Sequence, residues 1–212
     1  MKRVLFGLCL LFLANLTFAQ VDFLFGLRGG MNSSSVKMDE MIIENTASKE
    51  KWLLSAGASK VGFHGGFVSR IEVLMFFVQP ELLFTHSSSE IKVEDITKKT
   101  VTDKLQKFNK VDIPIMMGLK TGPVRFQLGP VATIMLSSTS EVKDLTGYED
   151  KFNSAVWGGQ AGLGIDILDK ISIDAKYQFG LSKLGDNVTY SNNTYNTNSK
   201  ERMWLLSLGY FF

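Results

Sequence analysis

Few side chains in this sequence of 212 residues are well suited to catalysis. It contains two histidines and one cysteine. His86 is followed by Ser87–Ser89 and Glu90, so a base, hydroxyl groups and a carboxylate occur together. A hydrolase of lipid or peptide that uses His86 is therefore one hypothesis, although a triad requires converging geometry that sequence neighbours do not guarantee. We expect His64, within an alternating apolar segment, to be a hydrogen-bonded core residue.

Metal and phosphate sites are not indicated. The one cysteine, Cys9, lies in the apolar N-terminal segment, and the acidic residues are scattered in pairs such as Asp39-Glu40 and Glu94-Asp95. Zinc sites need Cys or His ligands at short regular spacings, which are missing. Gly29-Gly30 and Gly65-Gly66 lie inside alternating segments with no helix after them, so they do not resemble a phosphate-binding loop. The sequence predicts no catalytic residue, no cofactor and no metal.

The first 19 residues have the composition of a secretory signal peptide. The basic pair Lys2-Arg3 precedes an apolar stretch over 4–16, and Thr17-Phe18-Ala19 ends in a small residue suited to cleavage. The apolar stretch is too short for a spanning helix, and the alternative is an uncleaved N-terminal anchor. We predict a signal peptide at 1–19 and one mature domain at 20–212.

The mature chain carries no net charge. The signal peptide holds two of the 23 basic residues, which leaves 21 basic against 21 acidic residues. Binding to nucleic acid depends mainly on neutralising phosphates, so no nucleic-acid partner is predicted. No stretch of 18 or more apolar residues follows the signal, so no spanning helix is predicted either.

Eight segments of the mature chain alternate between apolar residues and polar or small ones. In one of them, Ile171 and Ile173 alternate with Ser172 and Asp174. Alternation with period two predicts a β-strand with two different faces. A soluble sheet also alternates, but these segments are as long as the roughly 9–11 residues that a tilted strand needs to cross a bilayer. The segments are 22–33, 59–69, 74–87, 108–120, 123–137, 154–167, 171–181 and 202–212.

The connections between the segments alternate between long and short. Polar stretches of about 25, 20, 16 and 20 residues follow the first, third, fifth and seventh segments. The other connections are short and fall near Arg70–Val73, at Thr121-Gly122-Pro123 and at Leu168-Asp169-Lys170. Long extracellular loops and short periplasmic turns are typical of outer-membrane barrels. The prediction is an all-β fold: an eight-stranded antiparallel transmembrane β-barrel in the bacterial outer membrane, with four long extracellular loops and three short periplasmic turns. Pro130 predicts a bulge in its strand.

The last segment ends with an aromatic carboxy-terminal residue. One apolar face of this segment consists of Trp204, Leu206, Leu208, Tyr210 and Phe212. This arrangement is typical of the C-terminal signature that the barrel-assembly machinery recognises. We expect Tyr210 and Phe212 to lie in the interfacial aromatic girdle. The alternative is a buried edge strand of a soluble sandwich.

The polar face of the predicted strands carries many charges. Side chains just fill the interior of an eight-stranded barrel, and buried charges there must be paired and hydrogen-bonded. We therefore predict a salt-bridged lumen that fixes strand register. A proton or ion path is the alternative, and a porin is disfavoured by the strand number. The predicted network contains Arg28, Lys60, Glu81, Asp112, Arg125, Asp174 and Lys176, with Asp166, Gln79, Gln127, Gln160 and Gln178 beside them.

Six short motifs, one in each of six predicted strands, occur in an order and spacing that together are specific. They are Gly26-Leu27-Arg28-Gly29-Gly30-Met31-Asn32, Gln79-Pro80-Glu81-Leu82-Leu83-Phe84, Val111-Asp112-Ile113-Pro114-Ile115, Gln127-Leu128-Gly129-Pro130, Asp174-Ala175-Lys176-Tyr177 and Leu206-Ser207-Leu208-Gly209-Tyr210. In this order the chain resembles the PorT-like outer-membrane β-barrel family of the Bacteroidetes, over nearly the whole mature chain. The resemblance implies an eight-stranded outer-membrane barrel. One founding member of that family belongs to a protein-secretion apparatus, but a shared fold does not by itself transfer that role.

These observations favour a structural or interaction protein over an enzyme. The leading hypothesis is an accessory component of an envelope secretion or assembly complex. The alternatives are an autonomous surface barrel for adhesion or envelope stability, and a hydrolase using His86. Residues 186–199 are predicted to form a polar hairpin extension or loop. The expected partners are outer-membrane lipid, the barrel-assembly machinery during insertion, an envelope protein, and lipopolysaccharide phosphates at a rim with Lys98, Lys99, Lys104, Lys107 and Lys110.

Overall fold

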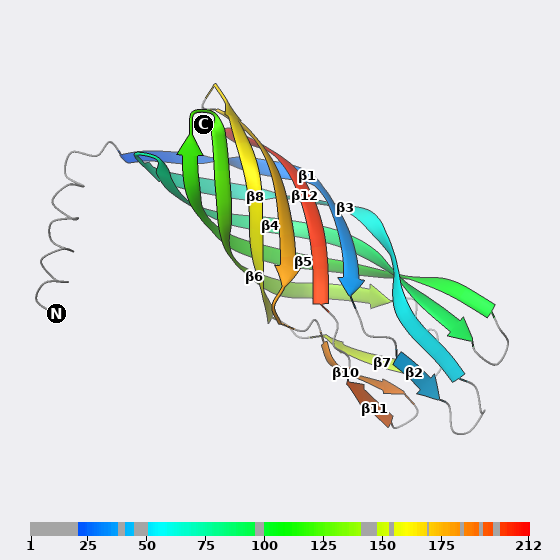
Figure 1. The fold of residues 1–212 in the computed structure, drawn as a ribbon. Helices are drawn as coiled ribbons and strands as arrows, with labels where there is room; N and C mark the ends of the chain where they lie inside the picture. Colours follow the sequence, from blue (N-terminus) through cyan, green and yellow to red (C-terminus); the bar gives the residue numbers. More distant parts are fainter. Residues whose placement is uncertain are drawn as a thin grey trace, which may run out of the picture.

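The computed structural model of the protein shows an antiparallel β-barrel (Figure 1). The predicted signal peptide at 1–19 lies outside the described residues. Among those residues, no helix is long and apolar enough to span a membrane. The structure describes residues 21–37, 41–44, 51–95, 100–140, 148–152, 155–168, 170–182, 185–190, 193–196 and 200–212.

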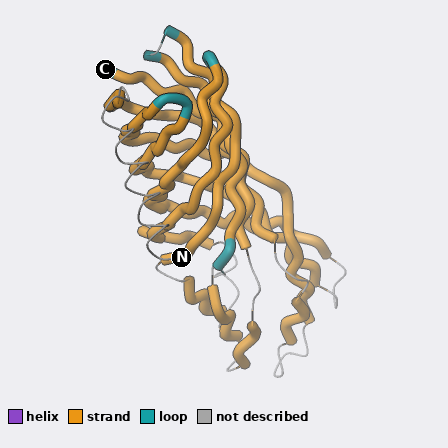
Figure 2. The backbone as a smooth tube through the Cα atoms, turned by 60° about the vertical axis from the view of Figure 1, so that its left-hand side comes forward, coloured by secondary structure: helices purple, strands orange, loops and turns teal. Residues whose placement is uncertain are grey.

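Eight strands form a closed wall in which each strand pairs antiparallel with both of its neighbours. The order around the wall is β1, β12, β9, β8, β6, β5, β4 and β3, and β1 closes the ring by pairing with β3 as well. Figure 2 shows the same strands as tilted tubes that wrap around one axis. The prediction of eight antiparallel strands is confirmed. The wall strands are β1 (Val21–Lys37), β3 (Lys51–Val73), β4 (Phe76–Asp95), β5 (Thr100–Thr121), β6 (Val124–Ser140), β8 (Ala155–Ile167), β9 (Ile171–Gly180) and β12 (Lys200–Phe211).

Four shorter strands lie beyond the wall. β2 (Met41–Glu44) pairs with the first residues of β3. A separate three-stranded sheet contains β7 (Tyr148–Phe152), β10 (Gly185–Tyr190) and β11 (Asn193–Asn196). β10 and β11 pair antiparallel. The described residues of the segment 186–199 therefore form the predicted hairpin.

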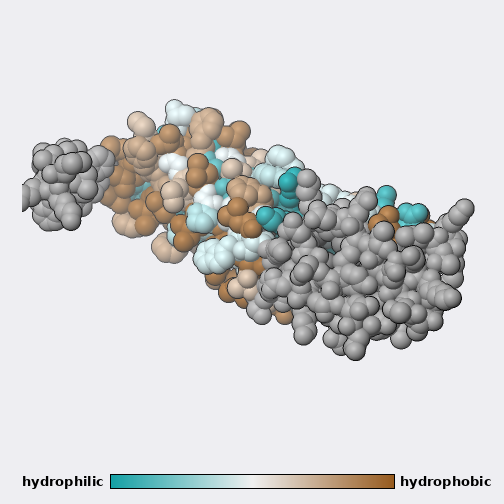
Figure 3. Space-filling model, turned by 60° about the horizontal axis from the view of Figure 1, so that its bottom comes forward, coloured by the Kyte–Doolittle hydropathy of each residue, from teal (hydrophilic) through white to brown (hydrophobic). Residues whose placement is uncertain are grey.

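The wall has an apolar outer face and a polar inner face. Along β12, the side chains of Trp204, Leu206 and Leu208 are 53–64% exposed, whereas Met203 and Leu205 are buried. The same period of two runs along the other wall strands, as the sequence predicts. Figure 3 shows apolar residues gathered over the wall on one side of the molecule. Such a continuous apolar belt matches the hydrocarbon core of a membrane rather than water.

The short connections lie at the end of the barrel where the chain ends (Figure 1). Gly122 forms the predicted turn between β5 and β6 with φ of 58°, a conformation that glycine adopts without strain. The prediction for the first short connection is wrong, because Arg70–Val73 belongs to β3 and the turn is Leu74-Met75. Leu74 itself has φ of 57°. The strand continues because its alternation does, with exposed Ile71 outside and buried Arg70 inside.

At the opposite end, several strands extend well past the apolar belt. β3, β4 and β5 have 23, 20 and 22 residues, about twice what a membrane crossing needs. The prediction of a long loop after 74–87 is therefore wrong for most of that stretch. β4 continues to Asp95 and β5 begins at Thr100, so most of these residues are in strands. Charged residues in this region lie opposite each other in the strand register, as Lys92 and Asp103 do. We refer to residues 88–95 and 100–107 as the β4–β5 extension.

The bulge predicted at Pro130 is also wrong. The register of β5 against β6 is constant from Pro114 opposite Val131 to Met117 opposite Leu128, which includes Pro130. The register shifts instead at Asn109 and Lys110, nearer the extension. A proline is tolerated in a strand wherever its nitrogen is not required as a donor, so proline alone does not locate a bulge.

Candidate functional site: the filled lumen and the extended rim

The centre of the lumen is an ion-pair cluster built by alternate residues of β1, β4 and β9. The Arg28 guanidinium donates to Glu81 at 2.5 Å and to Asp174 at 2.5 Å. The Lys176 ammonium donates to the same Glu81 oxygen at 2.6 Å, as does the amide of Gln79. All of these side chains are buried. Because the partners lie on different sides of the ring, the cluster crosses the lumen instead of lining it.

The cluster continues toward the end with the short turns. Arg125 donates through Nε to Asp166 at 2.8 Å, and its Nη2 lies 3.0 Å from Asp174. Arg70 lies 3.0 Å from both Asp166 and Glu72. The network therefore joins β1, β3, β4, β6, β8 and β9 through shared carboxylates.

Aromatic rings close the lumen next to Arg70. Its guanidinium lies 4.5 Å from the ring centroid of Phe211 and 5.6 Å from that of Phe77. Both rings are almost fully buried. A cation over an aromatic face is attracted by the ring quadrupole, and the attraction is stronger away from water. The end with the short turns is thus filled by apolar rings and paired cations.

A second buried cluster lies toward the extended end of the barrel. Lys110 donates to Glu201, whose carboxylate also accepts from Ser34 at 2.7 Å and from Ser87 at 3.3 Å. Phe108 and Met203 are buried as well. Polar pairs at both ends and side chains between them leave the lumen filled, as expected for a barrel of eight strands.

The structure places most residues of the predicted network together, but not all. Arg28, Glu81, Arg125, Asp174 and Lys176 share one cluster. Asp112 is buried, but its hydrogen-bond partner among the described residues is the Thr133 hydroxyl.

The prediction that Lys60 belongs to the lumen network is wrong. It lies 2.6 Å from Glu90 and its side chain is 44% exposed, so it is not a member of the buried network. The register of β3 against β4 shifts on both sides of Ser59. Against β1 the register is unshifted, and Lys60 lies opposite Ser34 in the last residue pair of these two strands, away from the central cluster.

Sequence reasoning missed Arg70, Glu72, Lys110 and Glu201. Arg70, Glu72 and Glu201 lie one to three residues beyond the predicted strands 59–69 and 202–212, whereas Lys110 lies inside the predicted strand 108–120. All four continue the inward phase of their strand, so following the alternation to and past the strand ends would have included them. The prediction that Lys110 belongs to the exposed lysine-rich rim is wrong, because Lys110 is fully buried.

The two histidines lie on opposite faces of the wall. His64 is buried and its Nε2 is 2.7 Å from the Ser207 hydroxyl, as expected of a hydrogen-bonded core residue. His86 stacks on Phe63 with ring centroids 5.2 Å apart, and its Nδ1 is 2.7 Å from Asn109. Ser87 and Ser89 are fully buried, on the opposite face of β4 from His86. In the described part of the chain, no hydrogen bond joins His86 to the serines beside it.

The C-terminal signature residues lie on the outer face. Trp204, Leu206, Leu208, Tyr210 and Phe212 are all exposed in the apolar belt. Tyr210 and Phe212 form an edge-to-face pair, with ring centroids 5.9 Å apart, at the end with the short turns. Trp204 lies against Tyr177 of β9, with centroids 4.8 Å apart. The penultimate residue, Phe211, points into the lumen instead.

A closed ring of eight strands with an apolar belt and a filled polar lumen defines a small transmembrane β-barrel. A sequence profile described as "Outer membrane protein beta-barrel domain" matches residues 18–186. The chain belongs to this family, and its location is the bacterial outer membrane.

Solved structures of outer-membrane proteins are similar to this chain over about nine-tenths of its length. Neisserial surface protein A has 12% sequence identity and a TM-score of 0.51, over 89% of this chain and 97% of that one. The attachment invasion locus protein Ail of Yersinia pestis has 15% identity and a TM-score of 0.45, over 90% and 99%. The outer-membrane protease OmpT of Escherichia coli has 10% identity and a TM-score of 0.32, over 90% and 96%. No curated protein matches the sequence. At these identities the first likeness supports the fold alone.

Proposed function

We propose that this protein is a non-conducting outer-membrane barrel with a structural and interaction role, and that its β4–β5 extension binds a macromolecular partner. The observation that carries the proposal is the contrast between the two parts of the same strands. Within the belt, the strands enclose a lumen filled by paired charges. Beyond the belt, β3, β4 and β5 continue as a paired sheet that is not needed to cross the membrane.

The β4–β5 extension has one buried face and one exposed face. Ile91 and Val93 are buried, whereas Lys92, Glu94 and Val101 are exposed. Cross-strand pairing already orders these residues, so binding would cost little conformational entropy. Outer-membrane barrels generally expose their longer connections to the outside of the cell, so the proposal assigns this face to the cell surface.

The more specific role that we propose is an accessory component of an envelope secretion or assembly complex. Its support is the resemblance of the six strand motifs to the PorT-like family of the Bacteroidetes. The second candidate is an autonomous surface barrel, which the exposed charged face of the extension favours. Neither candidate assigns a reaction to His86. We also propose that lipopolysaccharide phosphates contact the rim through Lys107, which is exposed on β5.

The test is co-purification of the tagged protein from its native outer membrane in gentle detergent, followed by mass spectrometry. Ile91 and Lys104 are cross-strand partners, so Lys92–Asp103 can be replaced by Asn-Gly to form a two-residue hairpin. The proposal expects a stoichiometric partner with the wild type and none with the shortened hairpin. A variant with a shortened β10–β11 hairpin is the control and should keep the partner. Heat-dependent gel mobility checks that every variant still forms a barrel.

An envelope protein as the partner would support the accessory role. A partner retained by the shortened hairpin would contradict binding through the extension. A barrel that purifies alone would favour the autonomous role, and binding to host-surface or matrix components would then be measured.

A further inference from the structure

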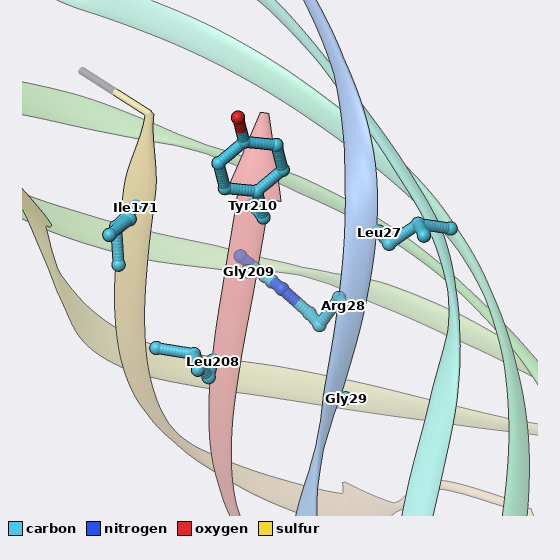
Figure 4. A pocket seen from close by; sticks show the side chains of 7 residues that line it. All are labelled: Leu27, Arg28, Gly29, Ile171, Leu208, Gly209 and Tyr210. Atoms are coloured by element: carbon cyan, nitrogen blue, oxygen red, sulfur yellow. The ribbon is translucent and has the colours of Figure 1, made fainter. Parts of the chain in front are cut away.

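An apolar groove runs along the membrane-facing wall near the end with the short turns (Figure 4). It has a volume of about 580 Å³ and lies over β1, β12 and the start of β9. Its lining includes Leu27, Gly29, Ile171, Leu208 and Tyr210. Figure 4 shows the side chains of Leu27 and Leu208 pointing away from each other.

Gly29 leaves the floor of the groove empty, although the barrel does not require glycine there. A Cβ added at Gly29 would meet no atom closer than the His64 carbonyl oxygen at 3.7 Å. At the next residue, Gly30, an added Cβ would lie 2.0 Å from the Leu206 carbonyl oxygen, so close strand approach demands glycine. The hollow at Gly29 therefore comes from the missing side chain and not from a close contact that requires glycine.

The groove is part of the surface that contacts lipid. Leu27, Leu208 and Tyr210 are about half exposed and alternate with inward residues, so they belong to the apolar belt. A polar ligand would lose its hydrogen bonds to water here and find few replacements. A hydrocarbon chain has no such cost, and the groove opens directly onto the medium that supplies one.

The position of the groove along the barrel indicates which leaflet of the outer membrane it contacts. Ile171 follows the short turn between β8 and β9, and Tyr210 lies two residues before the end of the chain. Short turns of outer-membrane barrels face the periplasm, where the leaflet consists of phospholipid. A tyrosine at this depth has its ring among the chains and its hydroxyl at the headgroup level.

We propose that this groove is a binding site for one acyl chain of a phospholipid from the periplasmic leaflet, with the Tyr210 hydroxyl beside the headgroup. The site is independent of the extension at the other end of the barrel. It holds a lipid longer than the surrounding belt does, because the acyl chain lies against Ile171 and Leu208 with no side chain at Gly29 beneath it.

The test is native mass spectrometry of the full barrel extracted from its own outer membrane in mild detergent. Gly29→Leu fills the floor of the groove. Gly65→Leu is the matched control, because Gly65 lies directly opposite Gly29 on β3. A Cβ at Gly65 would likewise meet nothing closer than 3.6 Å, and Gly65 does not line the groove. Heat-dependent gel mobility must show that all three proteins are folded.

The wild type and Gly65→Leu are expected to retain one phospholipid per barrel. Gly29→Leu should lower the lipid-bound fraction by about tenfold or more. Equal retention by Gly29→Leu and the wild type would overturn the site, as would a wild type without bound lipid. Retention of lipopolysaccharide, or of a second barrel in place of lipid, would overturn the assignment to the periplasmic leaflet.

Discussion

At the scale of single residues, the central feature is Arg28, which holds two carboxylates at once across the lumen. Glu81 and Asp174 both lie 2.5 Å from its guanidinium and are inaccessible to solvent. Removing one partner from a buried ion pair leaves an uncompensated charge, whereas removing a partner at the surface leaves a charge that water can solvate.

We predict that Arg28→Met lowers the free energy of unfolding by about 3–5 kcal/mol, because Glu81 would keep only Lys176 and Asp174 only Arg125 as a cationic partner. Urea titration of the barrel in lipid vesicles measures the change. Lys60→Met removes a cation from the partly exposed Glu90 pair and should have little effect. A similar loss of unfolding free energy in the two variants would argue that the central cluster contributes no more to stability than the exposed pair.

A second prediction at this scale concerns His86. Its Nδ1 is bonded to Asn109 and its ring stacks on Phe63, which accounts for the residue without a reaction. We expect His86→Ala to leave the hydrolysis of membrane phospholipids and of peptides unchanged. Purified wild type and variant are compared in the same lipid vesicles. A wild-type activity that disappears in the variant would restore the hydrolase hypothesis.

At the scale of elements, the two faces of β12 have different roles: one faces lipid and the other packs inside the lumen. Its outward residues, ending in Tyr210 and Phe212, form the signature proposed for the assembly machinery. Phe211 points inward, is 1% exposed and packs its ring on Arg70 of β3. The last strand therefore closes the ring through its backbone pairs with β1 and through a buried aromatic contact.

We predict that Phe211→Ala lowers the free energy of unfolding by about 3–5 kcal/mol, as expected for a buried phenylalanine. Phe212→Ala should change stability far less, and should instead slow assembly in the presence of the barrel-assembly machinery. Unfolding titrations and timed assembly assays, read out by heat-dependent mobility, distinguish the two. A larger stability loss for Phe212→Ala would reverse the assigned roles.

At the scale of the whole molecule, the lumen is closed by charge pairing from end to end. Arg70, Arg125, Arg28 and Lys176 alternate with carboxylates toward the short turns, and Lys110 with Glu201 fills the other end. An ion entering this lumen would have to displace paired groups that are themselves poorly hydrated.

We therefore predict that the barrel reconstituted in planar bilayers shows no conductance above background at neutral pH. Single-channel recording at physiological salt provides the measurement. Regular conductance steps from the wild type would contradict the closed lumen and would favour the ion path that the sequence left as an alternative.

Much of this architecture follows from local alternation in the sequence. Successive side chains of a strand point to opposite faces, so Leu208 and Ser207 lie on different faces, as do Ile173 and Asp174. The alternation therefore predicts which face contacts lipid without knowledge of the neighbouring strands. Strand number and the order of long and short connections follow from counting such segments, which is why the eight-stranded barrel could be predicted.

The tertiary structure alone decided the pairing across the lumen and the ends of the strands. Arg28 meets Glu81 and Asp174 because the register and stagger of the whole ring bring them to one level, which no local pattern encodes. Lys60 lies in the last residue pair of β1 and β3, opposite Ser34, and contacts Glu90 there instead of the central cluster. The carboxylate that pairs with buried Lys110 comes from Glu201 of β12, which only the closed ring brings close. Strand ends were underestimated in the β4–β5 extension because its charged residues lie opposite one another in a continuous backbone pairing that no local apolar pattern indicates.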